Sequence, residues 1–462
     1  MADSQFDLII IGGGPGGYVA AIRAAQLGLR VALVERDHLG GICLNWGCIP
    51  TKALLKNATV VETLKHANDY GIHVEKFSAD FGKAIDRSRV VANRLVKGVE
   101  FLMKKNKVEV IKGEATLTAR DRVEIKSDGR ALTAPNIIIA TGARPLAIPG
   151  LPVDGQAVIT SREALELRQL PSPIVIVGAG AIGMEFAYIY RAYGAEVTLI
   201  EMLPHLLPRE DEEVSTEVEK AFKKLGVNFR VNTRVESAER AGENVRLKVT
   251  TNGAADEIIA QKVLVAISVR PNSENLGLEA LGVEMERGAI KVNEKMQTNV
   301  PGIYAIGDVT MQLPLAHVAS HQGIIAAETI AGKETRPLDL NNVPRCTYCV
   351  PQVASIGLTE AQARAQGYDV RIGKFPFRAN GKALGINEYD GFVKLVVDKQ
   401  YGEILGAHLV GPEVTELLGE LSLAKSAELT PEEIAHAVHA HPTLTEVIAE
   451  AALDALGRVI HM

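Results

Sequence analysis

Two cysteines five positions apart are the residues of this chain best suited to chemistry. Cys43 and Cys48 lie within Gly40–Lys52 (GGICLNWGCIPTK), which also holds the only tryptophan. On an ideal α-helix this spacing places the two Cα atoms roughly 8.7 Å apart, whereas a disulfide requires less than about 7 Å. A bridge therefore forms only if the backbone between them is distorted, and Gly47 gives the chain that freedom.

Such a bridge would close a very short loop, so it would restrict the unfolded chain little and add little stability. If the bridge exists, redox chemistry is therefore its better explanation. The alternative is a pair of buried cysteines in an unbroken helix.

A dinucleotide-binding pattern precedes the cysteine segment. Gly12, Gly14 and Gly17 have GxGxxG spacing, and Glu35 ends the strand that follows. Glycines let the backbone approach a pyrophosphate at a helix N-terminus, and the acid accepts a hydrogen bond from a ribose hydroxyl. The apolar runs and the helix stop predict a strand over 6–11, a helix over 18–27 and a strand over 30–34.

The same pattern recurs 166 positions later, with Gly178, Gly180 and Gly183 in the turn and Glu201 after the strand. Two units of one design imply two dinucleotides, which suits electron transfer between a bound flavin and a diffusible nicotinamide. A carboxylate favours NAD because it repels the 2′-phosphate of NADP, and the first arginine after Glu201 is Arg209.

The cysteine segment resembles the redox-disulfide segment of the FAD-dependent disulfide oxidoreductases with paired cysteines. These enzymes include members that act on dihydrolipoamide, glutathione and mercuric ion, and the resemblance covers essentially the whole chain. It implies that Cys43, farther from the flavin, exchanges with substrate, while Cys48 passes electrons to FAD. Glu201 differs from the basic pattern of the glutathione-specific members, and Gly457–Met462 lacks the cysteines of the mercuric-ion members.

The resemblance therefore implies oxidation of protein-bound dihydrolipoamide to lipoamide with reduction of NAD. It also implies a homodimer that serves lipoyl domains and the acyltransferase of 2-oxoacid dehydrogenase or glycine cleavage complexes. Another NAD(P)H-dependent disulfide reductase of the same family is the alternative within enzymes. A subunit with a chiefly structural role in a multienzyme complex is the alternative from a different class.

A candidate base lies near the C-terminus, in the segment His441-Pro442-Thr443-Leu444-Thr445-Glu446. Thr443 and Glu446 have capping-box spacing, which predicts a well-capped helix and nothing more. The resemblance adds that His441 is a proton acceptor oriented by Glu446, and that it serves the disulfide of the opposite subunit. Both interpretations are compatible.

Comparison of the two glycine units singles out Glu185, which takes the place that Val19 has in the first unit. Negative charge near a helix N-terminus is mildly stabilising, and this is the simpler explanation. The resemblance instead implies that Glu185 pairs with Lys52, the cation ending the cysteine segment, near the flavin.

The resemblance implies further cofactor contacts beyond the glycine turns. Asp308 is expected to bind the ribityl chain, and the backbone near His317 is expected to lie beside the flavin, with its side chain structural. Ser268-Val269 stands where the family usually has Gly-Arg, so we expect altered nicotinamide affinity. The additional predicted FAD residues are Lys52, Ala115, Thr141, Gly142, Asp308, Ala316 and His317, and those for NAD are Glu185, Val235 and Ser268.

Composition and patterning set the fold class. The chain has 462 residues and a net charge of −6, which gives no basic surface for nucleic acid. We expect an α/β fold with two Rossmann-like dinucleotide-binding domains, for FAD and NAD, plus an α+β C-terminal dimerisation domain. The predicted domains are 1–147 for FAD, 148–270 for NAD, 271–340 as a central segment completing the FAD site, and 341–462 as the interface domain.

The remaining cysteines, Cys346 and Cys349, form a CxxC pattern that could indicate a metal or redox site. We expect neither, because residues three apart in a strand face opposite sides and no further cysteines complete a zinc site. The sequence also shows no apolar run long enough for a membrane span and no signal sequence, which predicts a cytoplasmic protein or a processed organellar one.

Overall fold

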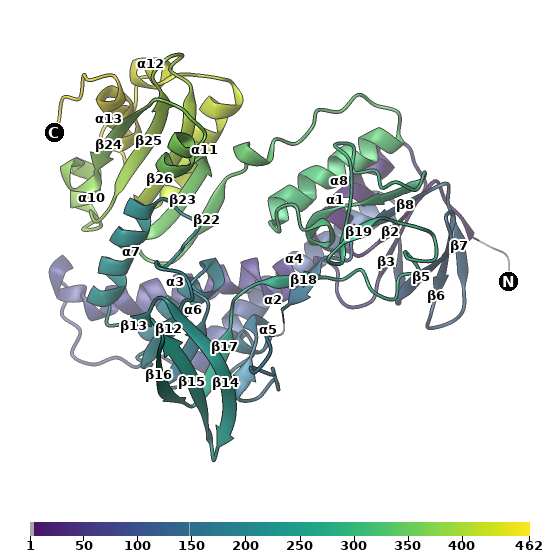
Figure 1. The fold of residues 1–462 in the computed structure, drawn as a ribbon, viewed down its shortest axis with the longest axis horizontal. Coiled ribbons are helices and arrows are strands. Elements are labelled where there is room, and N and C mark those ends of the chain that lie inside the picture. The colour runs from purple at the N-terminus through teal and green to yellow at the C-terminus, as the bar shows by residue number, and fades with distance from the viewer. Residues whose placement is uncertain (1–3, 147) are drawn as a thin grey trace. The chain divides into compact units, whose positions relative to one another are not determined.

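The computed structural model describes residues 4–146 and 148–462 (Figure 1). The chain divides into two compact units. Unit 1 comprises residues up to 53, 83–146 and 268–338, and unit 2 comprises the remaining segments to the C-terminus. Among the described residues, no helix has both the length and the apolar character that crossing a bilayer requires.

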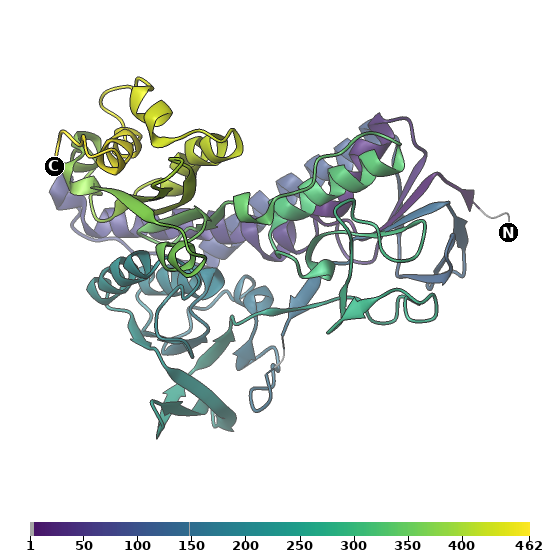
Figure 2. The same ribbon diagram turned by 45° about the horizontal axis from the view of Figure 1, so that its top comes forward.

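Unit 1 is built on a parallel sheet of five strands in the order β21-β8-β2-β3-β4. Its central strand is fully buried, as the continuous apolar run predicted. Helices α1 (Pro15–Gln26) and α8 (Ala316–Ile330) run side by side against this sheet (Figures 1 and 2). The strands are β2 (Leu8–Ile11), β3 (Val31–Glu35), β4 (Glu109–Lys112), β8 (Asn136–Ile139) and β21 (Ile303–Ala305).

Three smaller sheets complete unit 1. The four-stranded sheet contains β1 (Ser4–Gln5), β5 (Ala115–Ala119), β6 (Arg122–Ile125) and β7 (Ala131–Thr133). The two-stranded ones pair β9 (Ala143–Pro145) with β18 (Val269–Pro271), and β19 (Met285–Glu286) with β20 (Ala289–Ile290). The unit also contains α2 (Gly41–Trp46) and most of α4 (Phe81–Lys105), while α3 (Cys48–Lys65) continues from unit 1 into unit 2.

Unit 2 contains a second parallel sheet, in the order β10-β17-β11-β12-β13, and an antiparallel meander of three strands. The parallel strands are β10 (Val158–Ile159), β11 (Ile174–Val177), β12 (Val197–Ile200), β13 (Asn228–Arg230) and β17 (Lys262–Val265). The meander is β14 (Thr233–Ala241), β15 (Asn244–Thr251) and β16 (Ala254–Ala260). The helices are α5 (Ser161–Ala164), α6 (Ala181–Ala192) and α7 (Glu212–Lys224).

The C-terminal part of unit 2 is an antiparallel sheet in the order β22-β23-β26-β25-β24, packed against helices (Figure 1). Its strands are β22 (Arg345–Thr347), β23 (Gln352–Gly357), β24 (Val370–Pro376), β25 (Phe392–Asp398) and β26 (Ile404–Gly411). Its helices are α9 (Glu360–Ala365), α10 (Gly381–Gly385), α11 (Val414–Ser426), α12 (Pro431–His436) and α13 (Glu446–Ala455).

The two parallel sheets repeat the same register. Leu8 pairs with Val31 in unit 1, and Ile174 pairs with Val197 in unit 2, each partner lying 166 positions after its counterpart. The predicted fold class, two Rossmann-like units plus an α+β C-terminal part, is confirmed. The four predicted domain segments stay a prediction, and the boundary placed at residue 147 lies outside the described residues.

Candidate active site

Cys43 and Cys48 form a disulfide, with their Cα atoms 4.7 Å apart. The helix is broken between them, since α2 ends at Trp46, α3 begins at Cys48 and Gly47 is not helical. A Cβ atom at position 47 would lie only 3.3 Å from the Cα atom of Cys43, so glycine permits the close approach. The predicted distortion at Gly47 is therefore present, and an unbroken helix is excluded.

The break places Cys48 as the first residue of an 18-residue helix. The positive end of the helix dipole stabilises a thiolate there and lowers the energy of Cys48 as a leaving group. Lys52 follows four residues later, on the same face of this helix. The local backbone thus favours Cys48, rather than Cys43, as the thiolate.

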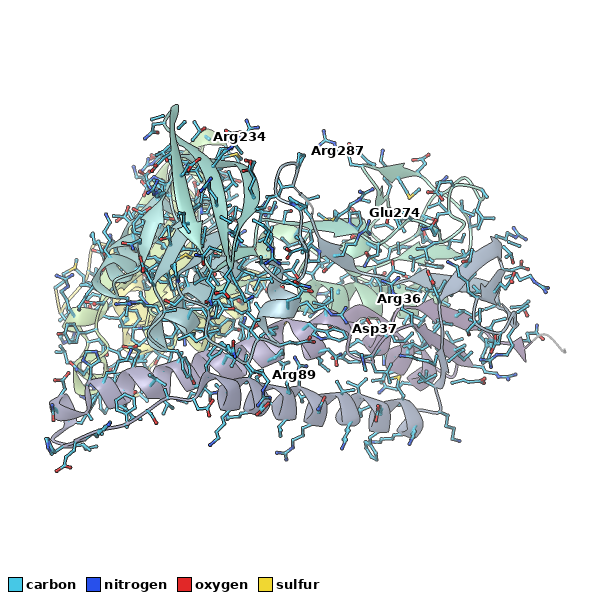
Figure 3. All side chains as sticks on the ribbon, turned by 90° about the horizontal axis from the view of Figure 1, so that it is seen from below. Arg36, Asp37, Arg89, Arg234, Glu274 and Arg287 are labelled. Atoms are coloured by element: carbon cyan, nitrogen blue, oxygen red, sulfur yellow. A yellow bond between two sulfur atoms is a disulfide. The ribbon has the colours of Figure 1, made fainter. Side chains whose placement is uncertain are left out.

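Side chains outside the motif hold the broken helix in place. Asn45 donates from Nδ2 to the carbonyl oxygens of Leu39 (3.0 Å) and Gly41 (2.9 Å). Arg89, on α4 (Figure 3), donates from its guanidinium to the Asn45 carbonyl near the C-terminus of α2. Arg89 was not predicted, because no local spacing connects it to a segment 44 positions away.

The two glycine turns have matching geometry. Gly12 and Gly178 have φ values of 107° and 103°, which favour glycine. A Cβ atom on Gly17 would lie 1.8 Å from the Gly12 oxygen, and one on Gly183 would lie 1.9 Å from the Gly178 oxygen. Only glycine therefore fits at the helix–strand crossing in either copy.

The terminal acids are held identically in the two copies. Glu35 accepts hydrogen bonds from the backbone amides of Gly13 (2.7 Å) and Asp37 (2.6 Å). Glu201 accepts from the amides of Ala179 (2.9 Å) and Leu203 (3.0 Å), which are the corresponding positions. Each oxygen keeps acceptor capacity for a ribose hydroxyl.

Both turns fit a dinucleotide. The helices that follow them begin after Gly14 and Gly180, and neither residue provides a side-chain cap. The first-turn N–H groups of these 12-residue helices therefore lack a side-chain acceptor at the N-cap, and a pyrophosphate would supply acceptors for them. In the first copy, the exposed Arg36 and Asp37 follow Glu35 directly (Figure 3).

Unit 1 brings further predicted flavin residues to the carboxyl ends of its strands. Asp308 follows β21, and burial raises the pKa of its carboxyl to about 6. A half-buried carboxyl of this kind suits partners that carry hydroxyl groups, as a ribityl chain does. Thr141 and Gly142 are tied to Asn272, which accepts from Thr141 Oγ1 at its carbonyl (2.7 Å) and donates to the Gly142 carbonyl (2.9 Å).

The other predicted cofactor residues lie on several elements. Ala115 begins β5, Val235 lies in β14, Ser268 precedes β18, and Ala316 and His317 form the start of α8. Their roles toward a cofactor stay predictions.

Glu185 is 3% exposed and lies in the first turns of α6. Its Oε1 accepts a hydrogen bond from the Tyr348 amide (3.0 Å), so it anchors the end of β22. The predicted partner Lys52 belongs to unit 1, and this pairing stays a prediction. Cys346 and Cys349, on either side of the contact, remain thiols.

His441 and Glu446 form a pair, with Nδ1 and Oε1 2.8 Å apart. Because Nδ1 faces a carboxylate, it carries the proton, and Nε2 is left as the basic nitrogen. The His441 side chain is 78% exposed, so Nε2 is open to a reacting group. Partial burial raises the pKa of Glu446, but the Thr443 amide and His441 together lower it below its usual range, which keeps the carboxylate ionised.

The capping-box interpretation of this segment is wrong. Helix α13 begins at Glu446, and its N-cap is Thr445, which makes no side-chain cap. Thr443 instead uses its hydroxyl to donate to the Ala440 carbonyl (2.6 Å), while its amide donates to Glu446 Oε2 (2.8 Å). Glu446 therefore serves His441 and the preceding loop, and the helix begins two residues later than the pattern predicted.

A buried ion network in unit 2 was not predicted. Lys394 is 2% exposed, and its Nζ lies 3.0 Å from Asp211, 2.7 Å from Glu213 and 2.8 Å from Glu360. Burial alone would lower its pKa, but the three carboxylates raise it well above the usual range. The network fastens the N-terminus of α7 to β25. The sequence did contain one indication of this network, because Lys394 interrupts the otherwise apolar run FVKLVVD.

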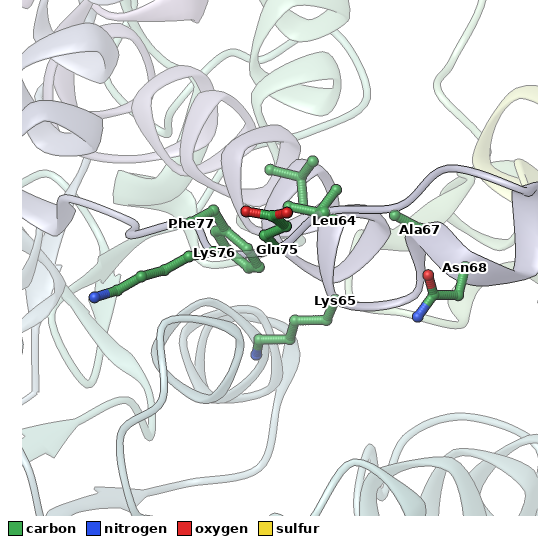
Figure 4. A pocket seen from close by; sticks show the side chains of 8 residues that line it. Leu64, Lys65, Ala67, Asn68, Glu75, Lys76 and Phe77 are labelled. Carbon is green, nitrogen blue, oxygen red and sulfur yellow. The ribbon is translucent and has the colours of Figure 1, made fainter.

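A surface pocket of about 300 Å³ lies at the C-terminal end of α3 and the segment that follows it (Figure 4). None of the predicted site residues lines it. Its lining comprises Leu64, Lys65, Ala67, Asn68, Val74, Glu75, Lys76 and Phe77.

Known proteins resemble this chain along its whole length. It is 47% identical to dihydrolipoyl dehydrogenase from Rhizobium etli over the full length of both proteins. It is 51% identical to dihydrolipoyl dehydrogenase from Mycobacterium bovis, over 99% of this chain and 100% of the relative.

Solved structures agree on the fold. LpdA from Mycobacterium tuberculosis superposes with a TM-score of 0.90 at 29% identity, covering 97% of this chain and 99% of that one. A copper(II) complex of the HOCl-induced flavoprotein disulfide reductase RclA from Escherichia coli superposes with a TM-score of 0.88 at 28% identity, covering 98% of this chain and 99% of that one.

Two family models match the chain. Residues 6–323 match the pyridine nucleotide-disulphide oxidoreductases, and residues 343–452 match the dimerisation domain of the same enzymes. This protein belongs to the pyridine nucleotide-disulphide oxidoreductase family.

Proposed function

We propose that this protein oxidises protein-bound dihydrolipoamide to lipoamide and reduces NAD, using the Cys43–Cys48 disulfide and FAD. The observation that carries the proposal is the disulfide itself, closed across a broken helix with its Cα atoms 4.7 Å apart. Two relatives at 47% and 51% identity over nearly the full chain are dihydrolipoyl dehydrogenases, which supports the choice of substrate.

The proposed cofactor sites are built on the two glycine turns. Gly12, Gly14, Gly17 and Glu35 would hold FAD, with Lys52, Ala115, Thr141, Gly142, Asp308, Ala316 and His317 around its flavin and ribityl parts. Gly178, Gly180, Gly183 and Glu201 would hold NAD, with Glu185, Val235 and Ser268. Bound there, FAD would supply two-electron transfer between the dithiol and the nicotinamide.

The protein's own residues perform the thiol chemistry. A substrate thiol attacks Sγ of Cys43 as His441 Nε2 takes its proton, and the sulfur–sulfur bond to Cys48 breaks. Cys48 leaves as a thiolate at the start of α3, where the helix dipole stabilises it. The second substrate thiol then attacks the substrate sulfur of the mixed disulfide, which closes lipoamide and releases Cys43, and the departing Cys43 sulfur takes the proton of that second thiol.

The protein is a homodimer, in keeping with its dimerisation domain. We infer that His441 of each subunit serves the disulfide of the other, so a monomer would be inactive with lipoamide. Lipoyl domains and the acyltransferase of 2-oxoacid dehydrogenase or glycine cleavage complexes are the proposed partners. The predicted cytoplasmic location and the predicted domain segments remain predictions.

The test is NADH formation by the purified, FAD-loaded protein with dihydrolipoamide. We expect turnover with NAD and little with NADP, and loss of turnover in Cys48→Ser. Consumption of NADH with glutathione disulfide as the substrate tests the alternative that the protein is another disulfide reductase of this family. Inertness toward dihydrolipoamide, despite full FAD content, would leave the structural-subunit alternative.

A further inference from the structure

A second histidine, two residues before His441, faces inward. His439 lies in the loop between α12 and α13, in the C-terminal part of unit 2 (Figure 1). Its side chain is 9% exposed, in contrast to the open ring of His441. It was not predicted as a site residue, because only the histidine beside Pro442 matched a known pattern.

Both ring nitrogens of His439 face oxygen acceptors. Nδ1 lies 2.9 Å from the Ala437 carbonyl oxygen, and Nε2 lies 2.9 Å from Oε1 of Glu420 on α11. A neutral imidazole carries one proton and can donate to only one of them. A doubly protonated ring donates to both, and in that form His439 and Glu420 are an ion pair.

This ion pair fixes the loop that carries His441. Upstream, His439 ties the loop to α11 through Glu420. Downstream, Asn380 donates from Nδ2 to the Thr443 carbonyl (3.0 Å), and the Thr443 amide donates to Glu446. His441 lies between these two anchors, with its Cα atom at most about 7.6 Å from that of His439.

The charge on His439 also affects the pKa of Glu446 in the neighbouring His441–Glu446 pair. His439 and His441 are both among the groups that lower the pKa of Glu446. The charged groups around His439 are thus Glu420 from α11, Glu446 from α13 and His441 from its own loop. A cation at this place favours Glu446 as a carboxylate, the form that accepts a hydrogen bond from His441 Nδ1–H.

We propose that His439, through its ion pair with Glu420, is a positioning residue for the His441–Glu446 pair. It does not touch substrate, and it acts by holding the loop and the orientation of the basic nitrogen. The proposal rests on the proposed function, in which His441 is the base of thiol exchange.

The experiment compares His439→Gln and Glu420→Gln with His436→Gln in the FAD-loaded dimer. His436 is the matched control, since it lies in the adjacent α12 with a 72% exposed side chain. We expect His439→Gln to lower kcat/KM for dihydrolipoamide about 10- to 100-fold, mainly through kcat, because small misplacements of a catalytic group cost rates of this order. In His439→Gln and Glu420→Gln, the rate of NADH oxidation by a one-electron dye should be unchanged, because this reaction needs no base for thiol exchange. The control His436→Gln should match the wild-type protein in both reactions.

A second readout does not depend on activity. In ¹⁵N-histidine spectra, we expect the ring resonances of His441 to shift in both His439→Gln and Glu420→Gln, and to stay in place in His436→Gln. If His439→Gln fails to fold, Glu420→Gln makes the same test with the histidine retained.

Full dihydrolipoamide turnover in folded His439→Gln or Glu420→Gln, or unshifted His441 ring resonances in both variants, would overturn the proposal. A wild-type protein that is inert toward dihydrolipoamide would instead refute the proposed function. In that case the shift of the His441 resonances still decides whether the ion pair positions the loop.

Discussion

Replacing Glu446 by glutamine should separate the two contacts that this carboxylate makes. Its Oε1 accepts from His441 Nδ1 and its Oε2 accepts from the Thr443 amide, both at 2.8 Å. Glutamine of the same size has one acceptor oxygen and one donor nitrogen, so it can satisfy only one of these two donors. Either His441 loses its partner or the Thr443 amide does.

The expected magnitude follows from the bond that is lost. A hydrogen bond to a charged group contributes about 1.5–3 kcal/mol, which corresponds to roughly a 10- to 150-fold change in rate if it is needed in the transition state. We expect kcat/KM for dihydrolipoamide to fall by this factor in Glu446→Gln. NADH oxidation by a one-electron dye should stay within twofold of the wild-type rate.

Glu450→Gln is the matched control. Glu450 lies one turn further along α13 and pairs with His461, with Oε1 2.5 Å from Nδ1, but it has no contact with His441 among the described hydrogen bonds. It should therefore leave lipoamide turnover unchanged. Equal losses in Glu446→Gln and Glu450→Gln would refute the reasoning, because the effect would then come from a general loosening of the helix.

Three further perturbations have defined outcomes. Cys48→Ser should abolish lipoamide turnover but lower the unfolding free energy by only about 2 kcal/mol or less, since the disulfide closes a very short loop; a denaturant titration with intact FAD measures this. Lys394→Met should destabilise the protein by about 3–5 kcal/mol in the same titration, because it leaves the buried Asp211 carboxylate without its cation, whereas Lys399→Met at the exposed Asp369 pair should cost under about 1 kcal/mol. For Asp308, burial raises the pKa of the carboxyl from 3.8 to about 6, so ionising it destabilises the FAD-free fold increasingly as pH rises from about 4 to about 6, by at most about 3 kcal/mol above that range. Asp308→Asn should therefore raise the Tm of the FAD-free protein at about pH 8 and leave it unchanged at about pH 4; a larger gain at the lower pH would contradict this sign.

The parts of the site that the sequence revealed are those set by local spacing. The glycines and the terminal acids follow from the dimensions of a strand, a turn and a helix, so the second copy repeats the first at a constant offset. The break at Gly47 likewise follows from helix geometry and the reach of a disulfide. Neighbouring strands in parallel sheets have continuous apolar runs, which is why β2 and β11 were predictable.

The remaining parts join residues that are far apart in the chain. Lys394 meets Asp211 across 183 positions, and Arg89 reaches Asn45 across 44. His439 meets Glu420 on a different helix, and no periodicity relates them. The predicted start of α13 was also wrong. Thr443 and Glu446 have capping-box spacing, but the hydrogen bond between them holds the loop of His441 and does not begin the helix.

Cysteine mapping after reduction by NADH tests the central claim most directly. FAD-loaded protein is incubated with NADH without oxygen, alkylated and digested, and the modified cysteines are identified by mass spectrometry. The account predicts that Cys43 and Cys48 become alkylated together, and only when NADH is added, because electrons travel from the nicotinamide to this disulfide. An intact Cys43–Cys48 disulfide after complete reduction of the flavin would contradict it.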